Sequence, residues 1–499
     1  MQTPDSRREL LFRFRGIPPI GTSVSLALQH LVAMIVGCVA PAIIIASAVG
    51  LGQSERVMLI QASLVMSAVC TVLQLFPIGK RFGSGLPVLL GVSFAYVPSM
   101  QAIAASGGGL SAIAGAMLVG GVVAVIVGIF VRKIRLLFPP VISGTVVFTI
   151  GLSLYPTAIN YMAGGASNTL EAVTGKGLSE ALAYGSWQNW LVACLTLAAV
   201  IVLNYKGKGI CKLASILLGM LFGYVVAALF GMVSFADVAD AAWFSLPRFM
   251  PFGISFDVSG CIAMGILFAI NSIQAIGDFT ATTVGGMNRD PSDNELQGGI
   301  IAYGVGNILS ALFGGLPTAT YSQNVGIVTT NKVVNRTVFT FAAGFLLLAG
   351  VSPKFAAILT TIPQCVLGGA TVTVFSTIAM TGMKLIASQN LTSRNTTIVG
   401  LSAALGVGIS QASASLSQFP EAVTMIFGKS PVVIATLMAV LLNLILPKEE
   451  KNHKILQRRS CPTDRSGVLH ICNAPPRASW RSIGFFISLL QILPRGSLP

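Results

Sequence analysis

The sequence predicts an all-α polytopic membrane protein with 14 transmembrane spans, arranged as two inverted repeats of seven spans each. Its 499 residues are 54% hydrophobic and only 9% charged, whereas soluble domains carry about 25% charged residues. Apolar runs of the length that crosses a bilayer recur along residues 24–447. The Lys and Arg residues between these runs also fall unevenly on the two sides that the runs define.

Each predicted span is an apolar run of roughly 17–25 residues, allowing for breaks. In the first half the runs cover roughly residues 24–50, 57–77, 85–104, 109–131, 136–155, 188–204 and 212–233. In the second half they cover roughly residues 258–285, 297–314, 316–330, 337–352, 364–386, 396–411 and 431–447. Because seven is an odd number, the two halves must have opposite orientations in the membrane.

The third and tenth runs are interrupted by Gly, Pro and polar residues, and they resemble each other. Gly85-Leu86-Pro87 recurs as Gly315-Leu316-Pro317, each before a polar and aromatic patch. In the second break, Thr318 to Tyr321 includes the β-branched and aromatic residues that favour a short strand. Ser322 or Asn324 is suited to cap a following helix. Non-helical backbone at membrane depth is tolerated only where it is buried in protein or lines a cavity. Paired breaks at matching positions therefore indicate the binding site of a transporter.

The loop charges predict a multi-pass protein of the cell (plasma or inner) membrane with both termini in the cytoplasm. Fourteen spans place 17 Lys and Arg residues in cytoplasmic loops and 5 in external loops, which is the asymmetry of the positive-inside rule. The net charge of +15 is explained by this topology and by a basic tail. It does not indicate a nucleic-acid partner.

The two ends of the chain differ from the apolar part. Residues 1–23 form a basic leader without a small-residue cleavage site, so a cytoplasmic leader is predicted and not a signal peptide. Residues 448–499 are basic and without periodicity, which predicts a disordered cytoplasmic tail, although so abrupt a change is also typical of a frameshifted C-terminus. Within the tail, residues 483–493 are apolar but too short to span, and would lie on the membrane surface.

Asp278 is the one carboxylate well inside a predicted span, which makes it a candidate functional residue. Asn271, Gln274, Asp278 and Thr282 are spaced so that they share one helix face. This stripe has two interpretations, a polar seam against a neighbouring helix or the wall of a cavity. The unpaired carboxylate favours the cavity. His30, in the first span, is either a hydrogen-bonded core residue or the second titratable group of the site; since Gln29 and His30 cannot share a face, one of them is expected to reach it.

The polar residues predict a flat, neutral ligand. Gln274 and Gln323 each present a donor beside an acceptor, which matches the alternating C=O and N–H edge of an oxidised nucleobase. Phe94 or Tyr96 would stack on the ring, and half-helix N-termini at the two breaks favour partial negative charge on ring oxygens. The absence of an intramembrane Arg or Lys argues against a fully charged anion, although helix dipoles alone could bind one.

Other functional classes lack their sequence patterns. The eight Cys residues form no CxxC pair and no zinc spacing. The chain also lacks a Ser/His/Asp, HExxH or paired-carboxylate constellation and a repeated selectivity-filter motif. Neither an enzyme nor a channel is predicted, and no cofactor or metal is expected beyond a coupling cation.

Together these residues resemble the nucleobase–ascorbate transporter family, also called nucleobase:cation symporters, which includes uracil, xanthine and uric acid permeases. The resemblance covers roughly residues 20–447. The motifs are Gln29-His30, Gly91-Val92-Ser93-Phe94-Ala95, Gly277-Asp278 and Gln323-Asn324-Val325-Gly326, in the first, third, eighth and tenth spans. The last of them is specific by itself, and the others add weight in combination.

The resemblance implies a homodimer in which a core domain moves against a gate domain like an elevator. The core would comprise spans 1–4 (residues 24–131) and 8–11 (258–352), and the gate spans 5–7 (136–233) and 12–14 (364–447). It also implies that Phe94 stacks on the base and that Gln323 hydrogen-bonds it with help from the backbone near Ser322. The expected substrate-binding set is Ser93, Phe94, Gln274, Tyr321, Ser322, Gln323 and Asn324.

Three positions depart from the family pattern. Gln274 stands where the family has a substrate-binding Glu, and Tyr303 stands where its purine transporters have an Asp. Asn331 replaces a Thr after the last motif. Without the two carboxylates, Asp278 and His30 remain as the proton-coupling pair, with Na⁺ as the alternative cation.

The predicted function is the import of a purine base, such as xanthine or uric acid, by symport with a cation, most simply H⁺. Gln323 favours the purine branch because uracil permeases tend to carry Glu at that position. A uracil or pyrimidine permease and a sulfate- or bicarbonate-type anion transporter on a similar fold are the alternatives. The expected partners are the small-molecule base, the lipid bilayer and a second copy of the chain.

Overall fold

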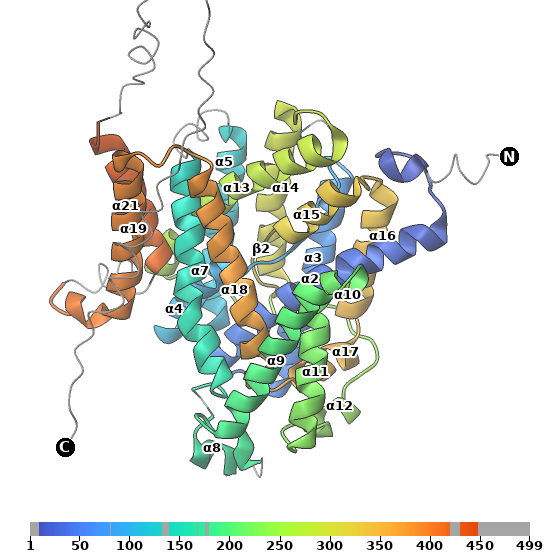
Figure 1. Cartoon of the computed structure of the whole chain (residues 1–499), viewed down its shortest axis with the longest axis vertical. Coiled ribbons are helices and arrows are strands. Elements are labelled where there is room, and N and C mark those ends of the chain that lie inside the picture. Colours follow the sequence, from blue (N-terminus) through green and yellow to red (C-terminus); the bar gives the residue numbers. More distant parts are fainter. Residues whose placement is uncertain are drawn as a thin grey trace, which may run out of the picture. The chain divides into compact units, whose positions relative to one another are not determined.

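The computed structural model describes residues 9–79, 81–131, 139–166, 168–174, 179–419 and 430–447. Within these ranges the chain is mostly helical, with one sheet of two short strands. Figure 1 shows strand β2 near the middle of the helices, between α18 on one side and α3 and α15 on the other. The predicted tail over residues 448–499, including its surface segment, lies outside the described residues.

The helices and the two strands follow one another along the described chain. In the first half they are η1 (Leu10–Phe12), α2 (Ile20–Val49), α3 (Gln53–Leu75), β1 (Leu90–Val92, a strand), η2 (Phe94–Tyr96), α4 (Val97–Ala105), α5 (Gly109–Ile129), α7 (Pro140–Met162), α8 (Leu170–Thr174), η3 (Glu180–Leu182), α9 (Trp187–Lys206), α10 (Ile210–Leu213), α11 (Ser215–Leu229) and α12 (Ala236–Ala239). In the second half they are α13 (Val258–Ala281), the π-turn η4 (Thr282–Gly286), α14 (Asp293–Leu312), β2 (Thr318–Thr320, a strand), α15 (Ser322–Asn331), α16 (Arg336–Gly350), α17 (Pro353–Thr360), α18 (Gln364–Ala387), α19 (Ser393–Gln411), η5 (Ser413–Leu416) and α21 (Pro431–Ile445).

In the described chain, seven helices are long and apolar enough to cross a membrane, or eight if α16 and α17 form one span bent by 78°. The seven are α2, α3, α5, α7, α9, α13 with η4, and α18. The other predicted spans also coincide with helices, but these are shorter or more polar. Helices α4 and α15 have 9 and 10 residues because a strand precedes each of them, and α14 and α19 begin with polar residues.

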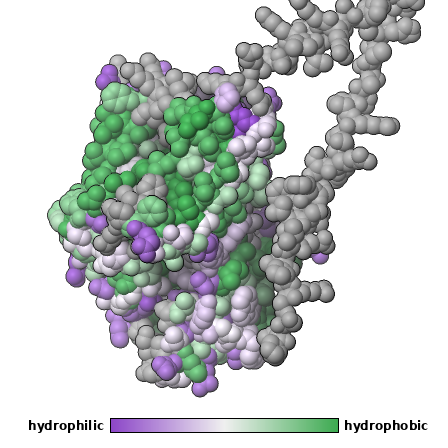
Figure 2. Space-filling view, turned by 90° about the vertical axis from the view of Figure 1, so that its left-hand side faces the viewer, coloured by the Kyte–Doolittle hydropathy of each residue, from purple (hydrophilic) through white to green (hydrophobic). Residues whose placement is uncertain are grey.

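Large hydrophobic side chains remain exposed on the outside of this bundle. Figure 2 shows a broad hydrophobic area on one face of the molecule. Exposed residues of this kind occur on α5 (Val122, Ile126, Ile129), on α19 (Leu401, Leu405) and on α21 (Leu437, Leu441, Leu444). Contiguous exposed apolar surface is unusual for a soluble monomer, whereas it is what a bilayer covers in a multi-pass membrane protein.

The N-terminal segment is attached to the loop before α16. The side-chain amide of Asn335 donates hydrogen bonds to the carbonyl oxygens of Leu10, Arg13 and Gly16, at 2.8, 3.0 and 3.1 Å. The first long helix starts at Ile20, directly after Pro19, so the last four residues of the predicted leader are helical. Pro19 is the N-cap of this helix.

The two strands pair antiparallel, with Gly91 opposite Ala319. A two-stranded sheet leaves outer backbone groups unpaired, which is costly without water. Side chains satisfy them here. The hydroxyl of Thr71 on α3 accepts from the N–H of Leu90 (3.0 Å) and donates to its carbonyl (3.2 Å). The amide of Asn307 on α14 makes the equivalent pair of bonds with Thr318, at 2.7 and 3.2 Å. The sheet can therefore end inside the protein.

Candidate functional site

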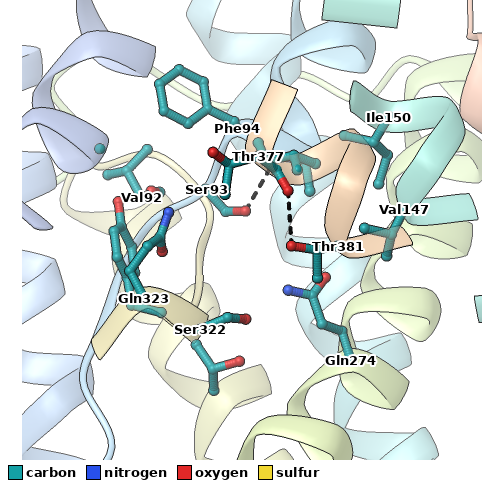
Figure 3. Close-up of a pocket in the computed structure, with 15 residues that line it drawn as sticks. Val92, Ser93, Phe94, Val147, Ile150, Gln274, Ser322, Gln323, Thr377 and Thr381 are labelled. Atoms are coloured by element: carbon teal, nitrogen blue, oxygen red, sulfur yellow. Dashed lines mark hydrogen bonds between the residues drawn. The ribbon is translucent and has the colours of Figure 1, made fainter. Parts of the chain in front are cut away.

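A cavity of about 210 Å³ lies where the sheet and the starts of η2 and α15 face α7, α13 and α18. Six of the nine predicted site residues line it, namely Ser93, Phe94, Gln274, Tyr321, Ser322 and Gln323 (Figure 3). No Lys, Arg, Asp or Glu among the described residues does so. The volume is below the roughly 300–1,000 Å³ of pockets for drug-sized ligands, which favours a small molecule, and the uncharged lining favours a neutral one.

The two glutamines have unused hydrogen-bonding capacity. Gln274 comes from the middle of α13 and Gln323 from the second position of α15. Within the described part of the chain, neither side-chain amide has a protein hydrogen-bond partner. Each can therefore offer a donor and an acceptor to a ligand.

The starts of two half-helices add backbone donors. No side chain caps α15, and in the described residues the backbone N–H groups of Ser322 and Gln323 have no acceptor. The N–H of Phe94, at the start of η2, is also without one. The first N–H groups of a helix lack an intrahelical partner and carry partial positive charge. These groups favour ligand oxygens that carry partial negative charge.

Of the two aromatic candidates, Phe94 reaches the cavity and Tyr96 does not. The ring of Phe94 packs edge-on against Phe375 of α18, with centroids 5.1 Å apart at an angle of 79°. Tyr96 is fully buried and its hydroxyl is hydrogen-bonded to that of Tyr303 on α14. Tyr303, which departs from the family pattern, therefore contacts the segment that carries Phe94 and does not line the cavity.

Tyr321 lines the cavity, but its hydroxyl is used internally and donates to the carbonyl oxygen of Val92 at 2.7 Å. Two glycines make room for this ring. A Cβ at Gly37 would lie 2.7 Å from the Tyr321 hydroxyl, and one at Gly91 would lie 2.8 Å from its Cε2 and 2.5 Å from the Cys38 sulfur. Side chains at these positions would displace Tyr321.

Asp278 lies directly behind the cavity wall, with 8% of its surface exposed. One carboxylate oxygen accepts a hydrogen bond from Ser322 at 2.8 Å, and the other accepts one from Thr320. Both donors belong to segments that line the cavity. Asp278 is therefore linked to the cavity through two hydroxyls and does not line it.

His30 and Asn324 do not line the cavity. The side-chain amide of Asn324 donates to the carbonyl oxygen of His30 at 3.2 Å, so it joins α15 to α2 and turns away from the cavity. The buried His30 ring packs against Phe339 at 4.8 Å. Among the described residues no hydrogen bond or ion pair connects His30 to Asp278. The structure therefore does not place Asn324 in the cavity lining, and the geometry gives His30 no contact with Asp278.

Most residues of the predicted polar stripe on α13 do not line the cavity. Only Gln274 lines it. Asn271 donates to the carbonyl oxygen of Leu267 at 3.0 Å, and Thr282 donates to that of Asp278 at 2.8 Å. Both side chains donate to carbonyl oxygens of their own helix, a local bond that Asn and Thr side chains commonly make.

Helices α7 and α18 supply a wall that was not predicted, consisting of Val147, Ile150, Thr377, Ile378 and Thr381. Thr373, Thr377 and Thr381 recur every four residues, which places them on one helix face. That spacing is the one signal in the sequence that could have identified part of this wall. Val147 and Ile150 have no equivalent signal, because apolar residues fill every span.

Comparison with known proteins identifies a family whose model matches most of this chain. The model of a group described as "Permease family" (Xan_ur_permease) matches residues 21–415. The uric acid permease PucJ of Bacillus subtilis is 33% identical over 88% of this chain and 95% of its own length. The xanthine permease XanQ of Escherichia coli K12 is 30% identical over 90% of this chain and 96% of its own.

Two solved structures share the fold at low identity. The transmembrane domain of the cyanobacterium bicarbonate transporter BicA aligns with a TM-score of 0.52 at 16% identity, over 85% of this chain and 97% of that one. The murine anion transporter solute carrier 26 family member A9 aligns with a TM-score of 0.56 at 10% identity, over 88% and 70%. These likenesses establish the architecture alone.

Proposed function

This chain belongs to the permease family, and from that premise we propose that it imports a purine nucleobase such as xanthine or uric acid. Permeases are transporters and not enzymes, and the chain is a multi-pass membrane protein with several apolar helices. The names of its relatives, which include uric acid and xanthine permeases, support the purine class.

The main support for the proposal is that two side-chain amides and several backbone N–H groups around one cavity have no hydrogen-bond partner among the described residues. Gln274 and Gln323 offer donor and acceptor groups, and the N–H groups at the starts of η2 and α15 offer donors alone. An oxidised purine carries carbonyl oxygens and ring N–H groups on a flat frame, which uses both kinds of group. Phe94 supplies an aromatic face at the same cavity.

We further propose that transport is driven by protons through Asp278, with Na⁺ as the alternative cation. The carboxylate is buried, and both its oxygens are bonded to hydroxyls beside the cavity. In this proposal the 14 predicted spans form two inverted repeats, and the core domain moves against the gate domain like an elevator. The protein would act as a homodimer in the cell membrane with both termini in the cytoplasm.

Uptake measurements in a host that lacks its own purine permeases test the substrate class. We expect accumulation of radiolabelled xanthine or uric acid, increased by an inward proton gradient and competed by unlabelled purines. Competition by uracil in place of purines would support the pyrimidine alternative. Uptake insensitive to bases but competed by sulfate or bicarbonate would overturn the proposal in favour of an anion transporter.

A further inference from the structure

Helix α18 presents two threonines to the cavity, one helical turn apart. Thr377 and Thr381 both line it and are exposed there. Figure 3 shows Thr381 beside Gln274, on the other side of the cavity from Ser322 and Gln323. In the described chain, the remaining residues that α7 and α18 contribute to this wall are apolar, so the two hydroxyls are its polar side-chain groups.

Both hydroxyls have already used their hydrogen. Thr377 donates to the carbonyl oxygen of Thr373 at 2.8 Å, and Thr381 donates to that of Thr377 at 2.8 Å. A hydroxyl has one donor and two acceptor lone pairs. Since the hydrogen is held by the helix backbone, each oxygen can offer only its lone pairs to a ligand.

The opposite wall has the complementary character. The free backbone N–H groups of Phe94, Ser322 and Gln323 can only donate. Gln274 and Gln323 can match either kind of ligand group, but the remaining polar groups differ between the walls, with backbone donors at Phe94 and α15 and hydroxyl acceptors on α18 (Figure 3). The best-matched ligand carries carbonyl oxygens toward α15 and ring N–H groups toward α18.

We propose that Thr377 and Thr381 form a hydrogen-bond-accepting wall that binds ring N–H groups of the transported purine and selects for bases that retain them. This inference rests on the proposed function and adds a rule of selectivity to it. A base with a methyl group or a ring-nitrogen lone pair at that place would meet an acceptor, and the mismatch leaves a desolvated acceptor unpaired.

Valine is the appropriate test substitution because it keeps the branched shape and removes the lone pairs. Thr377→Val and Thr381→Val are compared with Thr377→Ser and Thr381→Ser, which restore the hydroxyl. Thr373→Val is the matched control, since Thr373 lies one turn earlier on α18 and bonds the carbonyl of Ala370 at 2.7 Å, outside the cavity lining. Surface expression is measured for every variant.

The readouts are the KM for xanthine and its competition by xanthines methylated singly at each ring nitrogen. In wild type, methylation at one or more positions should abolish competition. The valine variants should raise the KM for xanthine about fivefold to tenfold, as expected for one lost hydrogen bond, and should discriminate less against those methylated xanthines. The serine variants and Thr373→Val should behave like wild type.

Two results separate the possible failures. If wild type transports purines but the valine variants match Thr373→Val in KM and in the methylxanthine profile, the accepting wall is wrong and the proposed function stands. If wild type transports no purine, the proposed function fails and this inference fails with it.

Discussion

The hydroxyl of Ser322 donates a hydrogen bond to Asp278 at 2.8 Å, which attaches the carboxylate inside α13 to the first residue of α15. The next residue along the chain, Gln323, lines the cavity. A carboxylate can only accept hydrogen bonds, whereas a protonated carboxyl also donates one. Protonation of Asp278 must therefore rearrange the bonding of the segment that carries the cavity groups.

Asp278→Asn should separate binding from proton coupling. The amide resembles the protonated carboxyl in charge and shape and cannot release a proton. In wild type, initial uptake should increase as the external pH is lowered at constant internal pH, because protons enter with the base. In Asp278→Asn this dependence should disappear, and accumulation against a gradient should stop.

The control for this prediction is Asp257→Asn. Asp257 caps the start of α13, accepting from the N–H of Gly260 at 2.6 Å, and Asn caps helices about as well. The pH dependence of uptake by Asp257→Asn should match that of wild type. If Asp278→Asn retained pH-driven accumulation, Asp278 would have no coupling role.

Gln323→Ala and Gln274→Ala should each reduce purine uptake to near background while surface expression stays normal. Each substitution removes a side chain able to make two hydrogen bonds to the base, worth about 2 kcal/mol together, or roughly thirtyfold in affinity. Gln53→Ala is the matched control, because Gln53 bonds Thr360 at 2.6 Å and does not line the cavity. Wild-type uptake in either cavity variant would remove that glutamine from the binding site.

The sequence predicts those residues of the site that are polar while their neighbours in the chain are apolar. Gln274 and Gln323 are conspicuous amides in apolar runs, and the repeated Gly-Leu-Pro breaks indicate the segments that pair as strands. Thr377 is less conspicuous, because a threonine within a span can bond the backbone of its own helix and need not line a cavity. Its role depends on α18 lying across from α15, a contact between helices distant in sequence. Asn324 resembles a cavity residue in the sequence because the preceding Gln323 lines the cavity, whereas the Asn324 side chain bonds the His30 carbonyl on α2.

Gly37→Ala should disturb the site without touching the ligand. The added methyl group would lie 2.7 Å from the hydroxyl of Tyr321 and 2.9 Å from its Cε1, so the ring or α2 must shift. Overpacking of this kind typically costs about 1–3 kcal/mol. We expect a lower thermal unfolding temperature in detergent and a raised KM for the base.

Gly21→Ala provides the comparison within the same helix, since nothing lies within 4 Å of the added atom. It should leave unfolding and uptake unchanged. Adding Tyr321→Phe to Gly37→Ala removes the nearest clashing atom and should recover part of the lost stability. Equal behaviour of Gly37→Ala and Gly21→Ala would show that the close approach to Tyr321 has no energetic consequence.

The buried pair of Tyr96 and Tyr303 allows a double-mutant cycle behind the cavity. Their hydroxyls are hydrogen-bonded, and the ring of Phe268 packs against both, with centroids 4.8 and 5.7 Å away. Tyr96→Phe or Tyr303→Phe alone leaves one buried hydroxyl without this partner, at a cost of about 1–3 kcal/mol. Removing both hydroxyls leaves neither one unpaired, so the double variant should be more stable than the sum of the single effects implies.

The same cycle, measured by uptake, tests whether the pair positions Phe94. Tyr96 ends the short helix η2 that Phe94 begins, so a shift of Tyr96 moves the aromatic face of the cavity. Each single variant should raise the KM for xanthine, and the double variant should restore part of it in parallel with stability. If stability recovers in the double variant while the KM stays at the single-variant value, the hydroxyls hold the fold but do not position Phe94. Strictly additive losses in both measurements would show that the two tyrosines act independently.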